Sequence, residues 1–198
     1  MKYTVLMGSP HPQGNTAALL NPFLDECKKL NIDCQVTWLY NQDIKPCLGC
    51  QGCQKNWEEF ACVQKDGMEE IAQAVRASDL LILATPIYSW YCTAPMKSVL
   101  DRLIYGMCKY YGGEKGPALL ENKPAASIVT CGYRTEKGCD LWEEGLKRWC
   151  KHTNMRYIGM LARRDLGPKQ PFMDPEKEEA ARDFAQALRI KLRLEGVL

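Results

Sequence analysis

The sequence has no long apolar segment and no strong excess of charge of either sign, and we expect no leader at its N-terminus. Its longest uninterrupted apolar run, Leu80 to Ala84, is far shorter than the roughly 20 residues that a helix needs to cross a bilayer. The 26 basic and 24 acidic residues leave a formal net charge of +2, which is too small to attract a polyanion such as nucleic acid by charge alone. The segment 1–6 reads as a strand and not as a signal peptide. We therefore expect a cytoplasmic protein with no membrane partner and no nucleic-acid partner.

What is present is the composition of a folded domain, since 46% of the 198 residues are hydrophobic and 25% are charged. Short aliphatic and β-branched runs alternate with longer amphipathic stretches, a pattern typical of βαβ units and a parallel sheet. The expected strands are 3–7, 34–39, 80–85, 125–130 and 155–161. We expect one domain over 1–198, with a cysteine-rich insertion at 40–65 and a long loop at 105–122.

The expected helices follow these strands and should cover both faces of the sheet, because crossovers between parallel strands are right-handed. They begin near Asn15 or Thr16, at Asp66, near Pro95, near Leu141 and near Pro175. Asp66 and Glu69 resemble a capping box at the start of the second helix. In the resulting three-layer α/β domain, ligands bind at the carboxyl ends of the strands, so the loops 8–16, 85–91 and 130–138 are the expected site.

The first of these loops joins a strand directly to a helix N-terminus, where free backbone N–H groups and the helix dipole favour an anion. Ser9, Asn15 and Thr16 can add hydrogen bonds to a phosphate, each contributing roughly 1.5–3 kcal/mol. The loop lacks the lysine of a P-loop, the Gly-x-Gly-x-x-Gly of a dinucleotide site and any cysteine nucleophile. It therefore predicts a phosphate that is anchored and not transferred.

The loop after the third strand, Thr85-Pro86-Ile87-Tyr88-Ser89-Trp90-Tyr91, carries three aromatic residues where the ligand crevice should be. Planar ring systems bind between apolar and aromatic faces, with polar groups at the edge of the ring. A phosphate site and a flat-ring site at neighbouring strand ends indicate a ligand that resembles a mononucleotide. An alternative is that these aromatic residues cover a sheet end or a subunit interface.

Five features at these positions carry a resemblance to a known family: Gly8-Ser9-Pro10 with Gly14-Asn15-Thr16, Pro46-Cys47-x-x-Cys50-x-x-Cys53, Asp66-x-Met68, Thr85-Pro86-Ile87-Tyr88, and Met96-Lys97 with Asp101-Arg102. With these features the chain resembles the flavodoxin-like NAD(P)H-dependent FMN reductases, a group that includes the iron-sulfur flavoproteins. The resemblance implies a five-stranded sheet in the order 2-1-3-4-5, FMN as cofactor and NAD(P)H as co-substrate.

The resemblance also implies positions for the cofactor. The residues expected to bind FMN are Ser9, His11, Gly14, Asn15, Thr16, Pro86, Ile87, Tyr88, Ser89, Trp90, Thr130, Cys131 and Gly132. His11 stands where family members usually have arginine, and its imidazole can still donate to phosphate. Tyr88, Trp90 and Tyr133 are expected to shape the face that meets the electron acceptor. No side chain is needed as a catalytic nucleophile or base, because the hydride chemistry belongs to the flavin.

Eleven cysteines, in a chain that we expect to carry no export signal, favour reduced thiols or metal ligands over disulfides. Only Cys47, Cys50, Cys53 and Cys62 form a constellation, with a spacing of the kind that holds a [4Fe-4S] cluster; four thiolates could also hold zinc. The favoured interpretation is a metal-free loop that packs near the flavin or a neighbouring subunit. A cluster that passes single electrons to FMN is the alternative.

The expected function is hydride transfer from NAD(P)H to FMN and onward transfer to a small acceptor such as a quinone or free flavin. The alternatives are an electron-transfer iron-sulfur flavoprotein and a flavin-dependent sensor.

The loop 105–122 is expected to reach a partner's flavin in a homodimer or homotetramer. Asp101 and Arg102 are expected to form a structural ion pair, and Arg163-Arg164 to lie in a solvated turn that could attract the extra phosphate of NADPH.

Overall fold

A computed structural model describes residues 1–167 and 169–196. Its strands are β1 (Lys2–Met7), β2 (Asp33–Trp38), β3 (Leu80–Pro86), β4 (Pro124–Cys131) and β5 (Arg156–Arg164). Its α-helices are α1 (Asn15–Lys29), α2 (Met68–Ala77), α3 (Ala94–Met107), α4 (Thr135–Gly138), α5 (Asp140–His152) and α6 (Pro175–Leu194). Two short 3₁₀ helices, Leu39–Asn41 and Gly52–Lys55, lie between β2 and α2.

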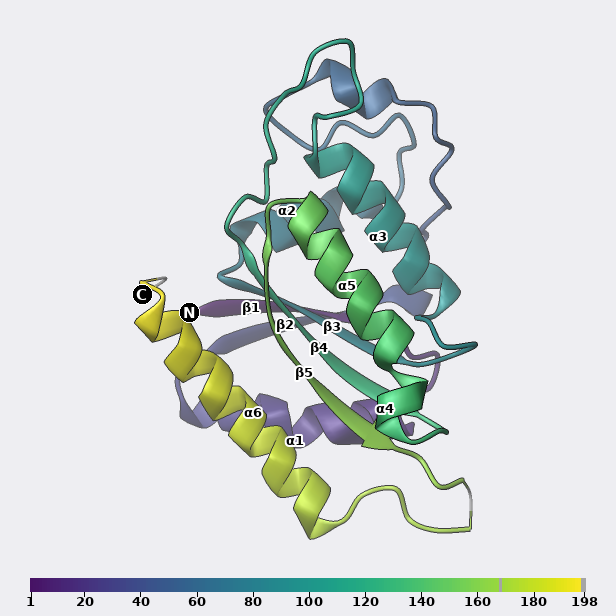
Figure 1. The fold of residues 1–198 in the computed structure, drawn as a ribbon, viewed down its shortest axis with the longest axis vertical. Coiled ribbons are helices and arrows are strands. Elements are labelled where there is room, and N and C mark those ends of the chain that lie inside the picture. The colour runs from purple at the N-terminus through teal and green to yellow at the C-terminus, as the bar shows by residue number, and fades with distance from the viewer. Residues whose placement is uncertain (168, 197–198) are drawn as a thin grey trace.

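The strands form one parallel sheet in the order β2-β1-β3-β4-β5, which confirms the predicted topology. Helices α1 and α6 pack on one face of the sheet, and α2, α3 and α5 pack on the other (Figure 1). Strand β4 is buried along its whole length and β3 along all but its last residue, as strands covered on both faces must be. The sheet therefore lies between two hydrophobic layers.

Each layer is built from an apolar stripe at helical spacing. The first layer lies between the sheet and helices α1 and α6. In it, Leu19, Leu20 and Phe23 of α1 are almost fully buried, and α6 contributes Ala181 and Leu188. The second layer contains the buried faces of α2, α3 and α5, with Trp142 as its largest fully buried apolar side chain. Cys27 and Cys150 belong to these layers, as their spacing predicted.

Two local predictions are wrong. Helix α2 begins at Met68 after Gly67, and Asp66 accepts a hydrogen bond from the Met68 N–H instead of forming a capping box with Glu69. Arg163 and Arg164 do not lie in a turn, because they are the last residues of β5 and pair in register with Thr130 and Cys131. Tertiary pairing with β4 extends the strand past the point where its apolar pattern ends.

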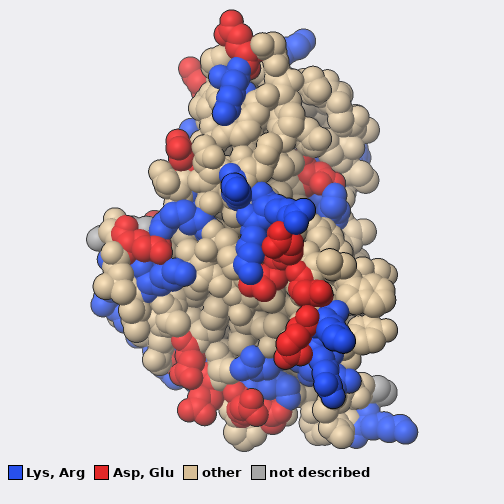
Figure 2. All heavy atoms as spheres, viewed as in Figure 1, with Lys and Arg blue, Asp and Glu red and all other residues tan. Residues whose placement is uncertain are grey.

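Charged side chains of both signs gather near the middle of the face shown in Figure 2, over the region of α5. On α5 they include the ion pairs Lys147–Glu143 and Arg148–Glu144, each one helical turn apart.

In the part of the chain that the structure describes, no helix combines the length and the apolar character needed to cross a bilayer.

Candidate functional site

The loop 8–14 connects β1 to α1 and ends on an uncapped helix. Gly14 is the N-cap, and no side chain caps α1 and no acidic residue occupies its first turn. The Ser9 hydroxyl, which is nearly buried, accepts from the His11 N–H at 3.2 Å and shapes the loop. His11, Pro12, Gln13 and Gly14 line an open hollow of about 490 Å³. The first turn of α1 thus offers backbone donors and a positive dipole end to an anion.

Two hydrogen bonds of buried threonine hydroxyl groups join this loop and the start of α1 to the neighbouring loops. Thr16 of α1 and Thr130 of β4 share a hydrogen bond of 2.7 Å between their hydroxyl groups. Thr93, which precedes α3, donates from its hydroxyl to the Gly8 carbonyl at 2.8 Å. A Cβ atom on Gly8 would lie 2.9 Å from the Thr93 hydroxyl oxygen, so only glycine allows this close approach. Hydrogen bonds therefore connect the loops after β1, β3 and β4 along the carboxyl edge of the sheet.

The loop after β3 makes a tight turn at this edge. Tyr88 and Tyr91 exchange two backbone hydrogen bonds of 2.8 and 3.0 Å, and Ser89 and Trp90 between them have φ values of 50° and 63°. The left-handed region is uncommon for residues with side chains, and such strain concentrates at functional sites. The turn directs Trp90 away from the core.

Trp90 and Tyr133 form a stacked pair, called here the aromatic clasp. Their ring centroids lie 5.5 Å apart with an interplanar angle of 18°. The Trp90 indole N–H also donates to the Lys137 carbonyl at 3.1 Å, so two contacts tie the loop after β3 to the loop after β4. Both rings remain about half exposed, Trp90 at 45% and Tyr133 at 61%. They are available to meet a planar ligand.

A pocket of about 430 Å³ opens beside the aromatic clasp. Its lining residues are Ile87, Tyr88, Ser89, Trp90, Cys131, Gly132, Tyr133 and Gly138. Most of the residues predicted to contact the flavin ring are in this set. Tyr91, the third aromatic residue of the loop, is not, because its ring packs edge-on against Trp142 at 5.4 Å in the hydrophobic layer.

The four clustered cysteines lie elsewhere, in the segment between β2 and α2. Cys47, Cys50, Cys53 and Cys62 all line one small cavity of about 20 Å³, which has room for about one water molecule. Two of the four sulfur atoms have other partners: the Cys53 thiol donates to the Tyr105 carbonyl, and Cys62 accepts from Arg102, each at 3.2 Å. Among the described residues, no three His, Cys, Asp or Glu side chains are arranged to hold a metal ion. The cavity does not fit a [4Fe-4S] cluster as it stands.

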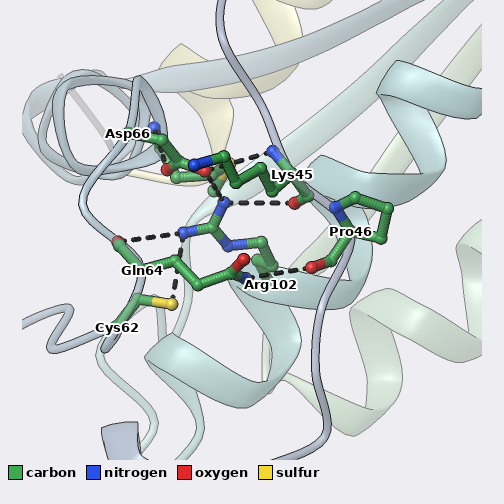
Figure 3. A network of polar contacts seen from close by, with 7 residues as sticks. Lys45, Pro46, Cys62, Gln64, Asp66 and Arg102 are labelled. Carbon is green, nitrogen blue, oxygen red and sulfur yellow. Dashed lines mark hydrogen bonds and ion pairs between the residues drawn. The ribbon is translucent and has the colours of Figure 1, made fainter.

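A buried ion pair anchors this segment to α3 (Figure 3). Arg102 contacts Asp66 at 2.5 Å, and the side chains of both residues are almost fully buried. Arg102 also donates to the carbonyls of Lys45 and Gln64. Burial raises the pKa of Asp66, but the ion pair and the backbone N–H groups of Lys45 and Met68 outweigh it and hold this pKa below its usual range.

The predicted ion pair between Asp101 and Arg102 is therefore wrong. Asp101 accepts from Lys97 on the surface of α3, at 2.6 Å, while Arg102 points inward to Asp66. Adjacent residues on a helix project about 100° apart, so the two side chains do not face each other. Lys97 lies four residues before Asp101, so helical spacing makes it the natural partner of this carboxylate.

Sequence analysis did not identify Lys109 as a structural residue. Its side chain is fully buried, and its ammonium donates to the carbonyls of Cys53, Glu59 and Gly106 at 3.0, 2.9 and 2.5 Å. Burial lowers the pKa of this lysine. Arg102 thus holds both ends of the cysteine segment (residues 40–65) against α3, and Lys109 holds its middle.

The strand order and the position of these loops define a flavodoxin-like protein. A solved structure of an FMN-dependent NADH-azoreductase from Bacillus anthracis, in complex with FMN, matches this chain with a TM-score of 0.70 at 17% sequence identity. The match covers 96% of this chain and 98% of the azoreductase. It shows a shared fold.

Residues 1–161 match the family described as NADPH-dependent FMN reductase, and the chain belongs to that family. An iron-sulfur flavoprotein of Archaeoglobus fulgidus is 33% identical over 121 residues, which are 61% of this chain and 54% of that protein. An iron-sulfur flavoprotein of Methanosarcina thermophila is 28% identical over 134 residues, 68% of this chain and 65% of that protein. The chain thus matches between about half and two thirds of the length of these relatives.

Proposed function

We propose that the protein is an FMN-dependent oxidoreductase that takes hydride from NAD(P)H and passes electrons to a small acceptor such as a quinone or free flavin. The observation that carries the proposal is the arrangement of the loops at the carboxyl ends of the strands. The uncapped first turn of α1 is joined through the Thr16–Thr130 hydrogen bond to the strand end that lines the aromatic pocket. This arrangement suits a ligand with a phosphate at one end and a planar ring at the other.

The residues fall into two groups by the part of FMN they would hold. Ser9, His11, Gly14, Asn15 and Thr16 would bind the phosphate, and Thr130 would support Thr16. Pro86, Ile87, Tyr88, Ser89, Trp90, Cys131 and Gly132 would surround the ring. When bound, FMN supplies the acceptor for hydride.

The chain's own contribution is orientation and exclusion of water. Loop backbone groups are fixed by the turn at Tyr88–Tyr91 and by the Ile87 N–H, which donates to the Thr130 carbonyl at 2.8 Å. The half-exposed Tyr88, Trp90 and Tyr133 would align a second planar molecule against the cofactor, which lowers the barrier by positioning.

A visible absorption spectrum of the FMN-loaded protein under anaerobic conditions tests this function. We expect flavin bands that bleach when NADPH or NADH is added and return when a quinone is added. Binding of FMN without bleaching by either nucleotide would reject the enzyme and favour a sensor.

Trp90→Ala is expected to lower FMN affinity roughly two- to tenfold, because an aromatic pair contributes about 0.5–1.5 kcal/mol beyond its buried area. Quenching of flavin fluorescence measures the affinity. Trp57→Ala is the matched control, since Trp57 is 43% exposed but lies in the cysteine segment, outside the pocket lining. Equal affinities for the two variants would show that the aromatic clasp does not contact the ring.

A second candidate is an electron-transfer protein that carries FMN and a [4Fe-4S] cluster. Two observations favour it: all four clustered cysteines line the same cavity, and the relatives described above are iron-sulfur flavoproteins. The thiols would have to leave their present partners to bind a cluster. Iron and acid-labile sulfide in anaerobically purified protein would support this candidate, and their absence would leave the metal-free loop.

Homodimer or homotetramer formation is also proposed, with the loop 105–122 near a partner's flavin. Within one chain, this loop packs on the cysteine segment, where Gln54 accepts from the Tyr111 N–H at 3.1 Å. Size-exclusion chromatography with light scattering tests the assembly. A monomer that retains FMN would contradict a shared site.

A further inference from the structure

Cys131 and Cys139 bring two sulfur atoms into contact inside the protein. Cys131 is the last residue of β4, Cys139 directly precedes α5, and the Cys139 thiol donates to Cys131 Sγ across 3.2 Å. Both side chains are buried, with 4% and 0% exposed. A disulfide bond is about 2.05 Å long, so the two sulfurs need to approach by only about 1 Å to form one.

The surroundings of the two sulfurs differ in a way that makes Cys131 the nucleophile. The hydrogen bond from Cys139 and the nearby Arg164 guanidinium lower the pKa of Cys131, against the effect of burial. Arg164 pairs with Cys131 across β4 and β5 and donates to the Gly132 carbonyl at 3.2 Å. The same sulfur–sulfur hydrogen bond and burial raise the pKa of Cys139. The thiolate, which is the reactive form, therefore develops on Cys131.

Cys131 lines the pocket beside the aromatic clasp together with Gly138, so this pocket is the side from which a small molecule would approach its sulfur. A Cβ atom on Gly138 would lie 3.0 Å from Cys131 Sγ, which is closer than normal packing allows. A larger residue at position 138 would crowd the Cys131 sulfur at the wall of the pocket, and glycine avoids this. Cys139 lies behind Cys131 and has no exposed surface.

We propose that Cys131 and Cys139 form a redox-active dithiol that a hydroperoxide oxidises to a disulfide. Cys131 thiolate attacks one peroxide oxygen, the O–O bond breaks, and the second oxygen leaves as water or an alcohol after taking up a proton. The sulfenic acid on Cys131 is then attacked by Cys139 sulfur, the S–O bond breaks, and water leaves. Two electrons pass from the two sulfurs to the peroxide.

The disulfide would close a loop over 131–139, and this loop contains both groups that hold Trp90. These groups are the Tyr133 ring and the Lys137 carbonyl. The dithiol therefore belongs to the wall of the pocket that we assign to the flavin, and its relation to the cofactor rests on the proposed function. The sulfur chemistry itself requires no cofactor.

Peptide mapping of the full-length protein tests the proposal. The protein is treated with hydrogen peroxide, remaining thiols are blocked with N-ethylmaleimide, and trypsin is used without reductant. Cleavage separates the two residues, because Arg134 and Lys137 lie between them. We expect peptides 116–134 and 138–147, each with a single cysteine, to be joined in most molecules and to separate after dithiothreitol.

Two variants test whether the joined peptides depend on Cys139 in particular. Cys139→Ser should abolish the joined peptides and leave a sulfenic acid on Cys131 that dimedone traps. Cys150→Ser is the matched control, because Cys150 is equally buried on α5 and burial raises its pKa to about 12, and it should leave the joined peptides unchanged. Separate alkylation of Cys131 and Cys139 in peroxide-treated wild-type protein would overturn the proposal. Mapping is carried out without FMN, so a failure of the proposed enzymatic function would not affect it.

Discussion

Asn15→Asp is expected to weaken FMN binding roughly 10- to 100-fold. Asn15 is the first residue of α1, where the amide side chain and the helix dipole would both favour a phosphate dianion. The change keeps the size of the side chain but replaces a hydrogen-bond donor with a like charge. A hydrogen bond to a charged group contributes about 1.5–3 kcal/mol, and each 1.4 kcal/mol is a factor of about ten in affinity. Isothermal titration with FMN measures the loss.

The stability of the fold should not decrease in this variant, because an acidic residue in the first turn stabilises a helix. Asn21→Asp makes the same substitution on an exposed position of the same helix and is the matched control. It should bind FMN as the wild type does. An Asn15→Asp protein with unchanged FMN affinity would show that the phosphate lies elsewhere.

Asp66→Asn is expected to lower the free energy of unfolding by about 3–5 kcal/mol, because it leaves the buried guanidinium of Arg102 without its carboxylate. Asp101→Asn removes a carboxylate from an exposed ion pair on the same helix as Arg102 and should cost at most about 1 kcal/mol. Urea denaturation followed by circular dichroism compares the two. Equal costs would contradict the assigned role of the buried pair.

The stabilisation by Asp66 should also depend on pH. The pKa of this carboxyl is lowered in the folded protein, so its contribution is complete above the pKa of about 3.9 in an unfolded chain and decreases as the pH falls through the folded pKa. The difference in unfolding free energy between wild type and Asp66→Asn should therefore be constant near neutral pH and shrink in acid. A difference that grows on acidification would have the wrong sign for this ion pair.

Much of the fold could be predicted because its signals are local. The continuous apolar runs of β3 and β4 indicate strands covered on both faces, and the stripe of Leu20, Phe23 and Cys27 indicates one buried helix face. The positions of the loops after β1, β3 and β4 follow from the parallel arrangement of these strands. The candidate phosphate loop and most of the pocket lining were identified for the same reason.

The features that were missed depend on contacts between distant parts of the chain. Arg102 pairs with Asp66 across 36 positions, and Lys109 donates to carbonyls 56 and 50 positions away. The sequence alone offers Arg102 only its neighbour Asp101 as an acidic partner. The sequence places Tyr91 near the ligand crevice with Tyr88 and Trp90, but its ring packs against Trp142 beyond the tight turn at Ser89 and Trp90. The contact of Cys131 with Cys139 likewise depends on how the loop 132–138 folds back.

The most direct test of the central claim is a comparison of FMN and riboflavin binding to the wild-type protein. The two ligands carry the same ring system and differ only in the phosphate, which we place on the first turn of α1. Competition titrations followed by flavin fluorescence should show FMN binding at least about tenfold more tightly, as expected for phosphate hydrogen bonds of about 1.5–3 kcal/mol each. Equal affinities for FMN and riboflavin would contradict the account.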